Sequence, residues 1–327
     1  MSAADIKRLL TDAQTEADQL DAELEAAQGE ADQLDTELAA ALEENARLEA
    51  DNATLTAALH KCKNPTRCTL VGMAGHPWEV RLAETGPVQV RRSFVNDLNV
   101  VTAANLLTAA REDKAAGRTS VLSLKVPSWS TAAVGDYDMA LTRLADDLNT
   151  VEGDVYLAVH HEPAGDGPAA AYAAMQAHVL PLLRRPHVKV CVIVNGFWFS
   201  HNARRKPLTD TQLAQWLPAK VLEVCDVVAA DCYHGGTPDQ PGGEPDELMV
   251  GMLEWSDRVS HGKPLGVGEF SGHTADAITH VGNVFADYPG RFVWACVFNS
   301  DRNNRPGVQW SLTGDRLTAF QALIREN

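Results

Sequence analysis

The chain has 327 residues, of which 45% are apolar and 22% charged, and a formal net charge of −16. At roughly 150 residues per domain, this length fits one large domain with an appendage or two smaller domains. The composition excludes a wholly disordered chain and a collagen-like chain. The sequence contains no apolar run of the roughly 18 residues that a membrane span needs. Its N-terminus lacks the apolar stretch of a secretory signal, so none is expected.

The negative charge is concentrated at the start of the chain. Residues 1–60 hold three basic and fifteen acidic residues, a net charge of −12, whereas residues 61–327 hold 25 basic and 29 acidic residues, a net charge of −4. Neither part is basic, so binding to the phosphate backbone of nucleic acids is not expected.

The first sixty residues carry a heptad pattern. The segment EADQLDAEL at 16–24 returns as EADQLDTEL at 30–38, which is an offset of two heptads. Apolar positions continue at alternating steps of four and three residues, with Ile6, Leu10, Leu20, Leu24, Leu34, Leu38, Leu48, Leu55 and Leu59 among them. A period of 3.5 residues over this length predicts a coiled coil over 1–60 rather than a single solvated helix.

The flanks of this heptad segment are acidic. One flank reads Glu16, Glu23, Glu30, Glu37, Glu44 and Asp51. Parallel self-association places acid opposite acid and so weakens the coil. We therefore expect a weak parallel dimer or trimer that serves attachment, strengthened by a larger assembly or a less acidic partner.

Six cysteines divide into two groups. Cys62 and Cys68 flank a short polar turn after the heptad segment, and without a secretory signal they are expected to stay as free thiols. The other four lie in apolar, strand-like runs and are expected to be buried; they are Cys191, Cys225, Cys232 and Cys296. The spacing matches no zinc motif.

Beyond a linker at 61–67, apolar runs alternate with helical patterns. Strands are predicted at 68–74, 88–95, 119–126, 154–161, 188–197, 226–233, 264–270 and 291–298. Helices are predicted near 99–112, 136–151, 168–185, 209–222, 245–260, 273–287 and 313–326. Eight such units in about 250 residues predict an α/β fold, a (β/α)8 TIM barrel over 68–327. The alternative, an open doubly wound sheet, is disfavoured because no Gly-rich phosphate loop follows an early strand.

Active sites of such barrels lie at the carboxyl ends of the strands. The fourth strand ends in His160, His161 and Glu162, and the seventh ends at Glu269. The other strand ends offer further polar and aromatic residues, namely Arg91, Arg92, Asn195, Trp198, Asp231, Tyr233, His234, Phe298 and Asn299. Burying two glutamates at strand ends is costly without a purpose, and two facing carboxylates are what glycoside hydrolysis requires. Either glutamate alone could instead form a salt bridge at the rim.

The HHEP and GEF motifs around these glutamates resemble the large clan of retaining (β/α)8-barrel glycoside hydrolases, and most closely its β-mannanase-type family. The resemblance covers roughly residues 68–327. It implies that Glu162 is the acid/base and Glu269 the nucleophile. It further implies that His161 and Tyr233 orient the nucleophile and that a strand-two arginine, Arg91 or Arg92, keeps it ionised. The clan has a Trp platform at the end of strand eight, where this chain has Phe298.

Further rim residues are candidates for binding sugar, with packing of the rim loops as the alternative. They are His160, Asn195, Trp198, His234, Phe298 and Trp78. No cofactor or catalytic metal is expected, because the first strand ends in Gly75-His76-Pro77 rather than in a His-x-His ligand pair, and adjacent His160 and His161 point to opposite sides of a strand.

The combination of an acidic heptad segment with a sugar-cleaving barrel is similar to minor tail proteins of bacteriophages. That resemblance implies a polysaccharide substrate on the host surface, neighbouring tail proteins as partners and a location in the virion after synthesis in the host cytoplasm. Two other functions remain open: a barrel that binds glycan without cleaving it, and a structural spacer. The pair of glutamates favours the enzyme, because a pure binder has no need for two opposed carboxylates.

Overall fold

The computed structural model describes residues 69–260, 262–304 and 308–327, together with isolated positions in the first forty residues. The chain divides into two units, Met1–Lys63 and Asn64–Asn327. The predicted coiled coil, apart from those isolated positions, lies outside the described residues. The predicted linker, Cys62 and Cys68 lie outside them as well.

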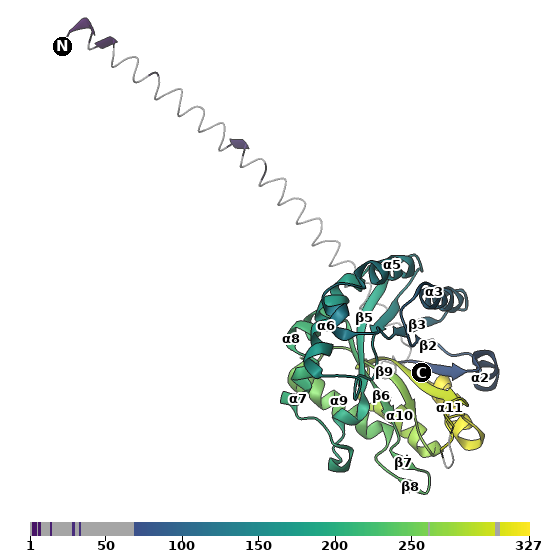
Figure 1. The fold of residues 1–327 in the computed structure, drawn as a ribbon. Helices are drawn as coiled ribbons and strands as arrows, with labels where there is room; N and C mark the ends of the chain where they lie inside the picture. The colour runs from purple at the N-terminus through teal and green to yellow at the C-terminus, as the bar shows by residue number, and fades with distance from the viewer. Residues whose placement is uncertain are drawn as a thin grey trace. The chain divides into compact units, whose positions relative to one another are not determined.

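Eight parallel strands close into a barrel, which confirms the predicted fold (Figure 1). The strands follow the order β1-β10-β9-β6-β5-β4-β3-β2 around the barrel. Their bounds are β1 Leu70–His76, β2 Val90–Val95, β3 Thr119–Leu124, β4 Val155–Val159, β5 Val188–Asn195, β6 Val227–Tyr233, β9 Leu265–Ser271 and β10 Phe292–Ser300. Each predicted strand lies within two residues of the observed one at either end.

Helices surround the strands (Figure 1). They are α2 Trp78–Thr85, α3 Val100–Ala115, α4 Trp129–Ala133, α5 Asp138–Leu148, α6 Ala169–Leu183, α7 Asp210–Trp216, α8 Ala219–Val224, α9 Pro245–Val259, α10 Ala275–Asp287 and α11 Gly314–Glu326. The predicted helix 209–222 is divided into α7 and α8, because Pro218 disfavours the helical conformation in the residue before it. Two 3-10 turns, η1 Gly196–Phe199 and η2 Ala203–Arg205, and a small hairpin of β7 Gly236–Thr237 with β8 Gln240–Pro241 complete the described elements.

Two hydrophobic layers hold the barrel together. The interior is filled by Val90, Val121, Ala158, Cys191, Ile193, Val227, Ala229, Trp294 and Cys296. A larger layer lies between the outer faces of the strands and the helices. Because both faces of the strands are buried, the strands read in the sequence as nearly continuous apolar runs. The prediction that Cys191, Cys225, Cys232 and Cys296 are buried is confirmed.

Gly72 marks the closest approach in the barrel wall, because a Cβ at this position would lie 2.0 Å from the carbonyl oxygen of Val90. We expect Gly72→Ala to lower the free energy of unfolding by at least about 2 kcal/mol, since the β1–β2 pairing has to shift. Urea unfolding of the two proteins measures this difference. The control is Gly29→Ala, where no atom lies within 4 Å of the added Cβ. Equal stability of Gly72→Ala and the unmodified protein would contradict the expectation.

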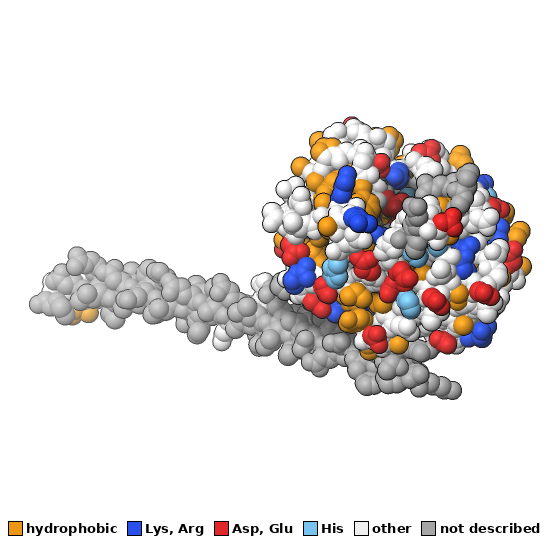
Figure 2. Space-filling view, turned by 90° about the horizontal axis from the view of Figure 1, so that it is seen from below, with side chains coloured by type: hydrophobic (Ala, Val, Ile, Leu, Met, Phe, Trp, Pro, Cys, Tyr) orange, Lys and Arg blue, Asp and Glu red, His pale blue; other side chains and the backbone are white. Residues whose placement is uncertain are grey.

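The surface of the barrel is mixed in character. On the face shown in Figure 2, acidic, basic and histidine side chains are interspersed with apolar ones. No helix among the described residues is long and apolar enough to cross a bilayer.

Candidate active site

The segment after β4 turns sharply and presents Glu162 to a cavity at the carboxyl ends of the strands. Glu162 and His160 have positive φ angles of 49° and 60°. Residues other than glycine reach this region at a cost of about 1–3 kcal/mol, and such residues cluster at functional sites. The backbone N–H of Glu162 donates to the carbonyl oxygen of Ile193, 3.0 Å away, which ties the turn to β5.

Glu269 lies within β9 and is 6% exposed. Its two carboxylate oxygens receive different donors: Arg92 donates from Nε to Oε1 at 3.2 Å, and the Tyr233 hydroxyl donates to Oε2. One donor is charged and the other is neutral, and together they fix the orientation of the Glu269 carboxyl group.

The surroundings of Glu162 disfavour its ionised form. Burial, followed by the nearby charge of Glu269, raises the pKa of Glu162 to about 7. Asn195 lies next to it, with Nδ2 at 3.5 Å from Oε1 of Glu162 and Oδ1 accepting a hydrogen bond from the backbone of Ala164. Glu162 can therefore hold a proton near neutral pH, as a general acid must.

Both glutamates line one cavity of about 580 Å3. Its walls are Phe94, His161, Glu162, Tyr233, Glu269, Phe298, Asn303 and Trp310. A second hollow of about 640 Å3 shares Phe94, Phe298 and Asn303 with it and extends along β2 and α3. This space is of the size that small ligands occupy in proteins.

The structure separates the two strand-two arginines. Arg92 is fully buried and contacts Glu269, whereas Arg91 pairs with Glu112 at 2.9 Å and lies over the ring of Trp78, 4.5 Å from its centroid. Alternation along the strand explains the difference, because Arg92 shares the inward face with Val90. Of the two candidates, Arg92 is the arginine that contacts Glu269.

His161 lies in the cavity but contacts Glu269 only indirectly. Its Nδ1 is 3.1 Å from the Ser123 hydroxyl, to which Arg92 also donates. Burial, followed by the charge of Arg92, holds the pKa of His161 well below its usual value, so the ring is neutral. The expected direct hydrogen bond from His161 to Glu269 is therefore replaced by a chain through Ser123 and Arg92.

Five of the six predicted sugar-binding residues are absent from the cavity walls, and four of these five pack against other partners. Trp78 contacts the guanidinium groups of Arg91 and Arg118. Trp198 is 3% exposed and packs against Trp216. Two histidines are also turned to other partners: His160 Nε2 bonds Asp166 at 2.9 Å, and His234 stacks on His273. These four residues therefore pack against other side chains, which was the alternative to sugar binding. Phe298 lines the cavity, and Asn195 contacts Glu162.

The sequence analysis missed three residues of the cavity walls, Phe94, Asn303 and Trp310, and gave Asp231 no role. Trp310, in the loop between β10 and α11, lines the cavity and is supported by Tyr233 and His273, whose ring centroids lie 5.1 and 5.7 Å away. Asp231 was noted only as a strand end, but its buried carboxyl group lies 3.6 Å from Nη2 of Arg92. An aromatic residue in the loop after the last strand was the signal available for Trp310.

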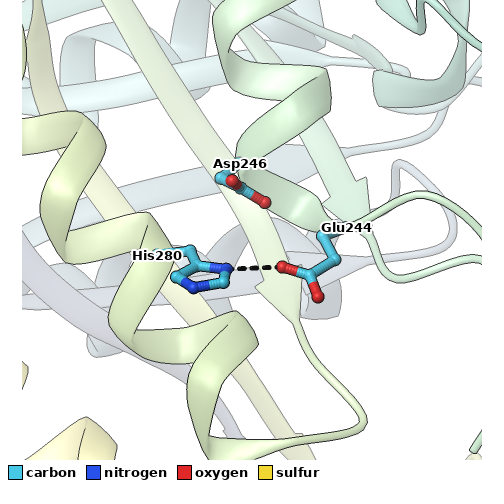
Figure 3. A group of neighbouring side chains, drawn as sticks. All are labelled: Glu244, Asp246 and His280. Atoms are coloured by element: carbon cyan, nitrogen blue, oxygen red, sulfur yellow. Dashed lines mark hydrogen bonds and ion pairs between the residues drawn. The ribbon is translucent and has the colours of Figure 1, made fainter.

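A separate group of side chains could hold a cation. Figure 3 shows Glu244 and Asp246 at the start of α9 facing His280 on α10, with His280 Nδ1 and Glu244 Oε2 2.6 Å apart. Their three candidate ligand atoms lie within 4.8 Å of one another. The helix dipole of α9 accounts for carboxylates at this position without any metal. None of the three residues lines the cavity around Glu162 and Glu269.

Comparisons with known proteins rest on the fold. No protein-family model matches the sequence, and no curated protein matches it. The structure is similar to GH5_18 from Bifidobacterium longum subsp. longum, with a TM-score of 0.55 at 11% identity over 79% of each chain. It is also similar to Cel5A from Thermotoga maritima, with a TM-score of 0.52 at 11% identity over 77% of this chain and 97% of that one. An engineered protein matches with a TM-score of 0.56 at 15% identity, over 79% of this chain and 70% of the other. At these identities, the likeness establishes a barrel fold shared with glycoside hydrolases.

Proposed function

We propose that the barrel is a retaining glycoside hydrolase that cleaves a polysaccharide. The observation that carries the proposal is the pair of carboxyl groups in one cavity, with Glu269 bonded to Arg92 and Tyr233 and Glu162 with a pKa of about 7. A module that only binds glycan needs neither a carboxyl group with a raised pKa nor a second one that is paired with a buried arginine. The fold shared with glycoside hydrolases supports the same reading.

In this mechanism, Glu269 attacks the anomeric carbon while Glu162 gives its proton to the departing glycosidic oxygen. The C–O bond to the leaving sugar breaks and a covalent glycosyl–Glu269 ester forms. Glu162, now ionised, removes a proton from water, and the hydroxyl attacks the same carbon to release Glu269. Two inversions give net retention, and each group returns to its starting protonation state.

The test is hydrolysis of a panel of bacterial surface polysaccharides and aryl glycosides, with the anomer of the first-formed product read by proton NMR. We expect release of reducing ends, with the configuration retained. An inverted product would contradict the nucleophilic role of Glu269. Binding of a glycan with no cleavage by the unmodified protein would favour the alternative, a glycan-binding tail protein.

Trp310 is expected to form the floor on which a sugar ring stacks, in place of the Trp expected at the end of strand eight. Trp310→Ala should lower kcat/KM roughly tenfold to hundredfold, mainly through KM, because an apolar stacking surface is lost. Steady-state kinetics on the best substrate measure the effect. Tyr288→Ala is the control, since Tyr288 is an exposed aromatic residue at the end of α10. Equal losses in the two variants would contradict the role of Trp310.

We further propose that residues 1–60 form a parallel coiled coil that attaches the barrel, through the linker 61–67, to a larger particle such as a phage tail. The heptad pattern and its acidic flanks support this proposal. Self-association into a dimer or trimer should strengthen with salt or at lower pH, because both reduce repulsion between the flanks. Sedimentation of the full chain at low and high ionic strength measures the mass. A monomer at every concentration and salt level would contradict self-association.

A further inference from the structure

Asp231 is a third carboxyl group beneath the two glutamates, and the proposed mechanism gives it no role. It lies on β6 next to Glu269 on β9 in the strand register. Its side chain is 0% exposed, and neither carboxyl oxygen accepts a hydrogen bond of normal geometry among the described residues, although the backbone N–H of Glu269 is close enough to favour the ionised form. A buried polar group without partners is costly, so its presence calls for a physical explanation.

The fold leaves space for this carboxyl group. A Cβ at Gly268, the residue before Glu269, would lie 2.2 Å from Oδ1 of Asp231. Any larger residue at 268 would therefore occupy the position of the Asp231 carboxyl group. The side chain is accommodated by a glycine beside one of the two proposed catalytic glutamates.

The charges around Asp231 decide its protonation state. The groups that face it are Arg92 from β2, Glu269 from β9, Glu162 after β4 and the thiol of Cys296 on β10. Burial raises the pKa of the Cys296 thiol, which is therefore neutral. One guanidinium thus faces three carboxyl groups, and an uncompensated carboxylate in such a buried site is strongly disfavoured.

The hydrogen bonds show which carboxyl group is paired with the Arg92 guanidinium. Arg92 donates to Glu269 at 3.2 Å, and the Tyr233 hydroxyl donates to Glu269 as well. The contact between Arg92 Nη2 and Asp231 is 3.6 Å, which is beyond a hydrogen bond. Glu269 therefore has both donors and Asp231 has neither.

We propose that Asp231 is a positioning residue that holds a proton beneath the Glu269–Arg92 pair, so that it packs against Arg92 without competing for the positive charge. An ionised Asp231 would draw the guanidinium toward itself and away from Glu269. The protonated form keeps Arg92 in place and leaves its charge to the proposed nucleophile. The catalytic consequence rests on the proposed hydrolase function, whereas the presence of the proton does not.

The direction of the Asp231 pKa agrees with this assignment. Burial raises the pKa of Asp231 well above its usual value, against the opposing effects of Arg92 and of the backbone N–H of Glu269. The nearby carboxylates Glu269 and Glu162 act in the same direction as burial.

Infrared difference spectroscopy of the full chain tests for the proton without relying on activity. At about pH 8, exposed carboxyl groups are ionised, and the background variant Glu162→Gln removes the neighbouring carboxyl group whose pKa is raised to about 7. Buried Asp113, whose pKa burial also raises, is present in every variant, so only a band that disappears with Asp231→Asn is assigned to Asp231. We expect the carbonyl-stretch band of a protonated carboxylic acid in Glu162→Gln and its loss in Glu162→Gln/Asp231→Asn. Absence of the band in Glu162→Gln, or its persistence in the double variant, would overturn the proposal.

Kinetics then test the positioning role. Asp231→Asn resembles the protonated acid in shape and charge, so it should keep more activity than Asp231→Ala, which should lose about tenfold to hundredfold in kcat as Arg92 loosens. Thermal unfolding of both variants verifies that they are folded. The pH above which activity falls, set by Glu162, should be unchanged in Asp231→Asn.

A downward shift of that pH by about one unit or more in Asp231→Asn would show that a negative charge has been removed, and would overturn the proposal. If the unmodified protein cleaves no glycan, the hydrolase function fails, while the infrared bands still decide whether Asp231 carries a proton.

Discussion

Glu269→Gln should lower kcat by at least about 10⁴-fold on every cleavable substrate, because the amide cannot form the covalent glycosyl ester. The substitution preserves shape: the amide oxygen can accept from Arg92, and the amide nitrogen can donate to the Tyr233 hydroxyl oxygen. Glycan binding should therefore be largely retained, with Kd changed by less than about tenfold. Steady-state kinetics and isothermal titration calorimetry of the same protein measure the two quantities.

The matched control is Glu254→Gln, which removes one carboxylate from an exposed position on α9, where it pairs with His201. Its kcat should equal that of the unmodified protein. If Glu269→Gln degrades polysaccharide as fast as the control does, Glu269 is not the nucleophile. If the variant loses both turnover and binding, thermal unfolding distinguishes a folding defect from a binding role.

Much of the fold could be predicted from the sequence because its determinants are local. Strands buried on both faces read as apolar runs, and proline, glycine and helix caps separate them from the helices. The positions of Glu162 and Glu269 followed from the fold, since strand ends of a (β/α)8 barrel meet at one face. Their neighbours in the cavity depend on contacts between distant segments.

The alternation of side chains between the two faces of a strand decides which residues of the site point into the barrel. Which of two adjacent arginines points inward depends on the register of β2, and no local pattern fixes it. Once Val90 is known to fill the interior, Arg92 follows as the inward residue, and Asp231 follows from Ala229 in the same way. After β4, the positive φ angles of His160 and Glu162 end the alternation, so the sequence could not show that His160 turns toward Asp166.

Aromatic residues were the least predictable part of the site. Trp198 follows a strand end, the position where a sugar platform is expected, yet it is 3% exposed and packs against Trp216 and Phe197. Trp310 lies ten residues beyond the end of β10, and reaches the cavity because Tyr233 and His273 support it. Both placements arise from packing between segments far apart in the sequence.

The activity of the unmodified protein should fall as pH rises through about 7, and this alkaline limb should be absent in Glu162→Gln. Burial and the charge of Glu269 raise the pKa of Glu162 to about 7. A general acid works only while protonated, so activity is fully present below this pKa and is lost above it. The pH dependence of kcat/KM on a polysaccharide or an aryl glycoside with a poor leaving group measures the limb.

The size of the Glu162→Gln effect should depend on the leaving group. Substrates that need protonation of the departing oxygen should slow by about 10²–10⁴-fold, while aryl glycosides with an acidic phenol should slow far less in the bond-breaking step. Glu162→Ala should be partly rescued by azide, because the anion attacks the glycosyl–Glu269 ester without needing a base, and the product is a glycosyl azide of retained configuration.

Glu254→Gln serves again as the control and should keep both the alkaline limb and the leaving-group dependence of the unmodified protein. Equal slowing of good and poor leaving groups in Glu162→Gln would contradict its role as the acid. A glycosyl azide of inverted configuration would mean that azide attacks the substrate directly, and the covalent intermediate on Glu269 would then have to be abandoned. Retention in the azide product therefore tests both carboxyl groups together, since it requires that Glu269 has reacted and that Glu162 is missing as the base.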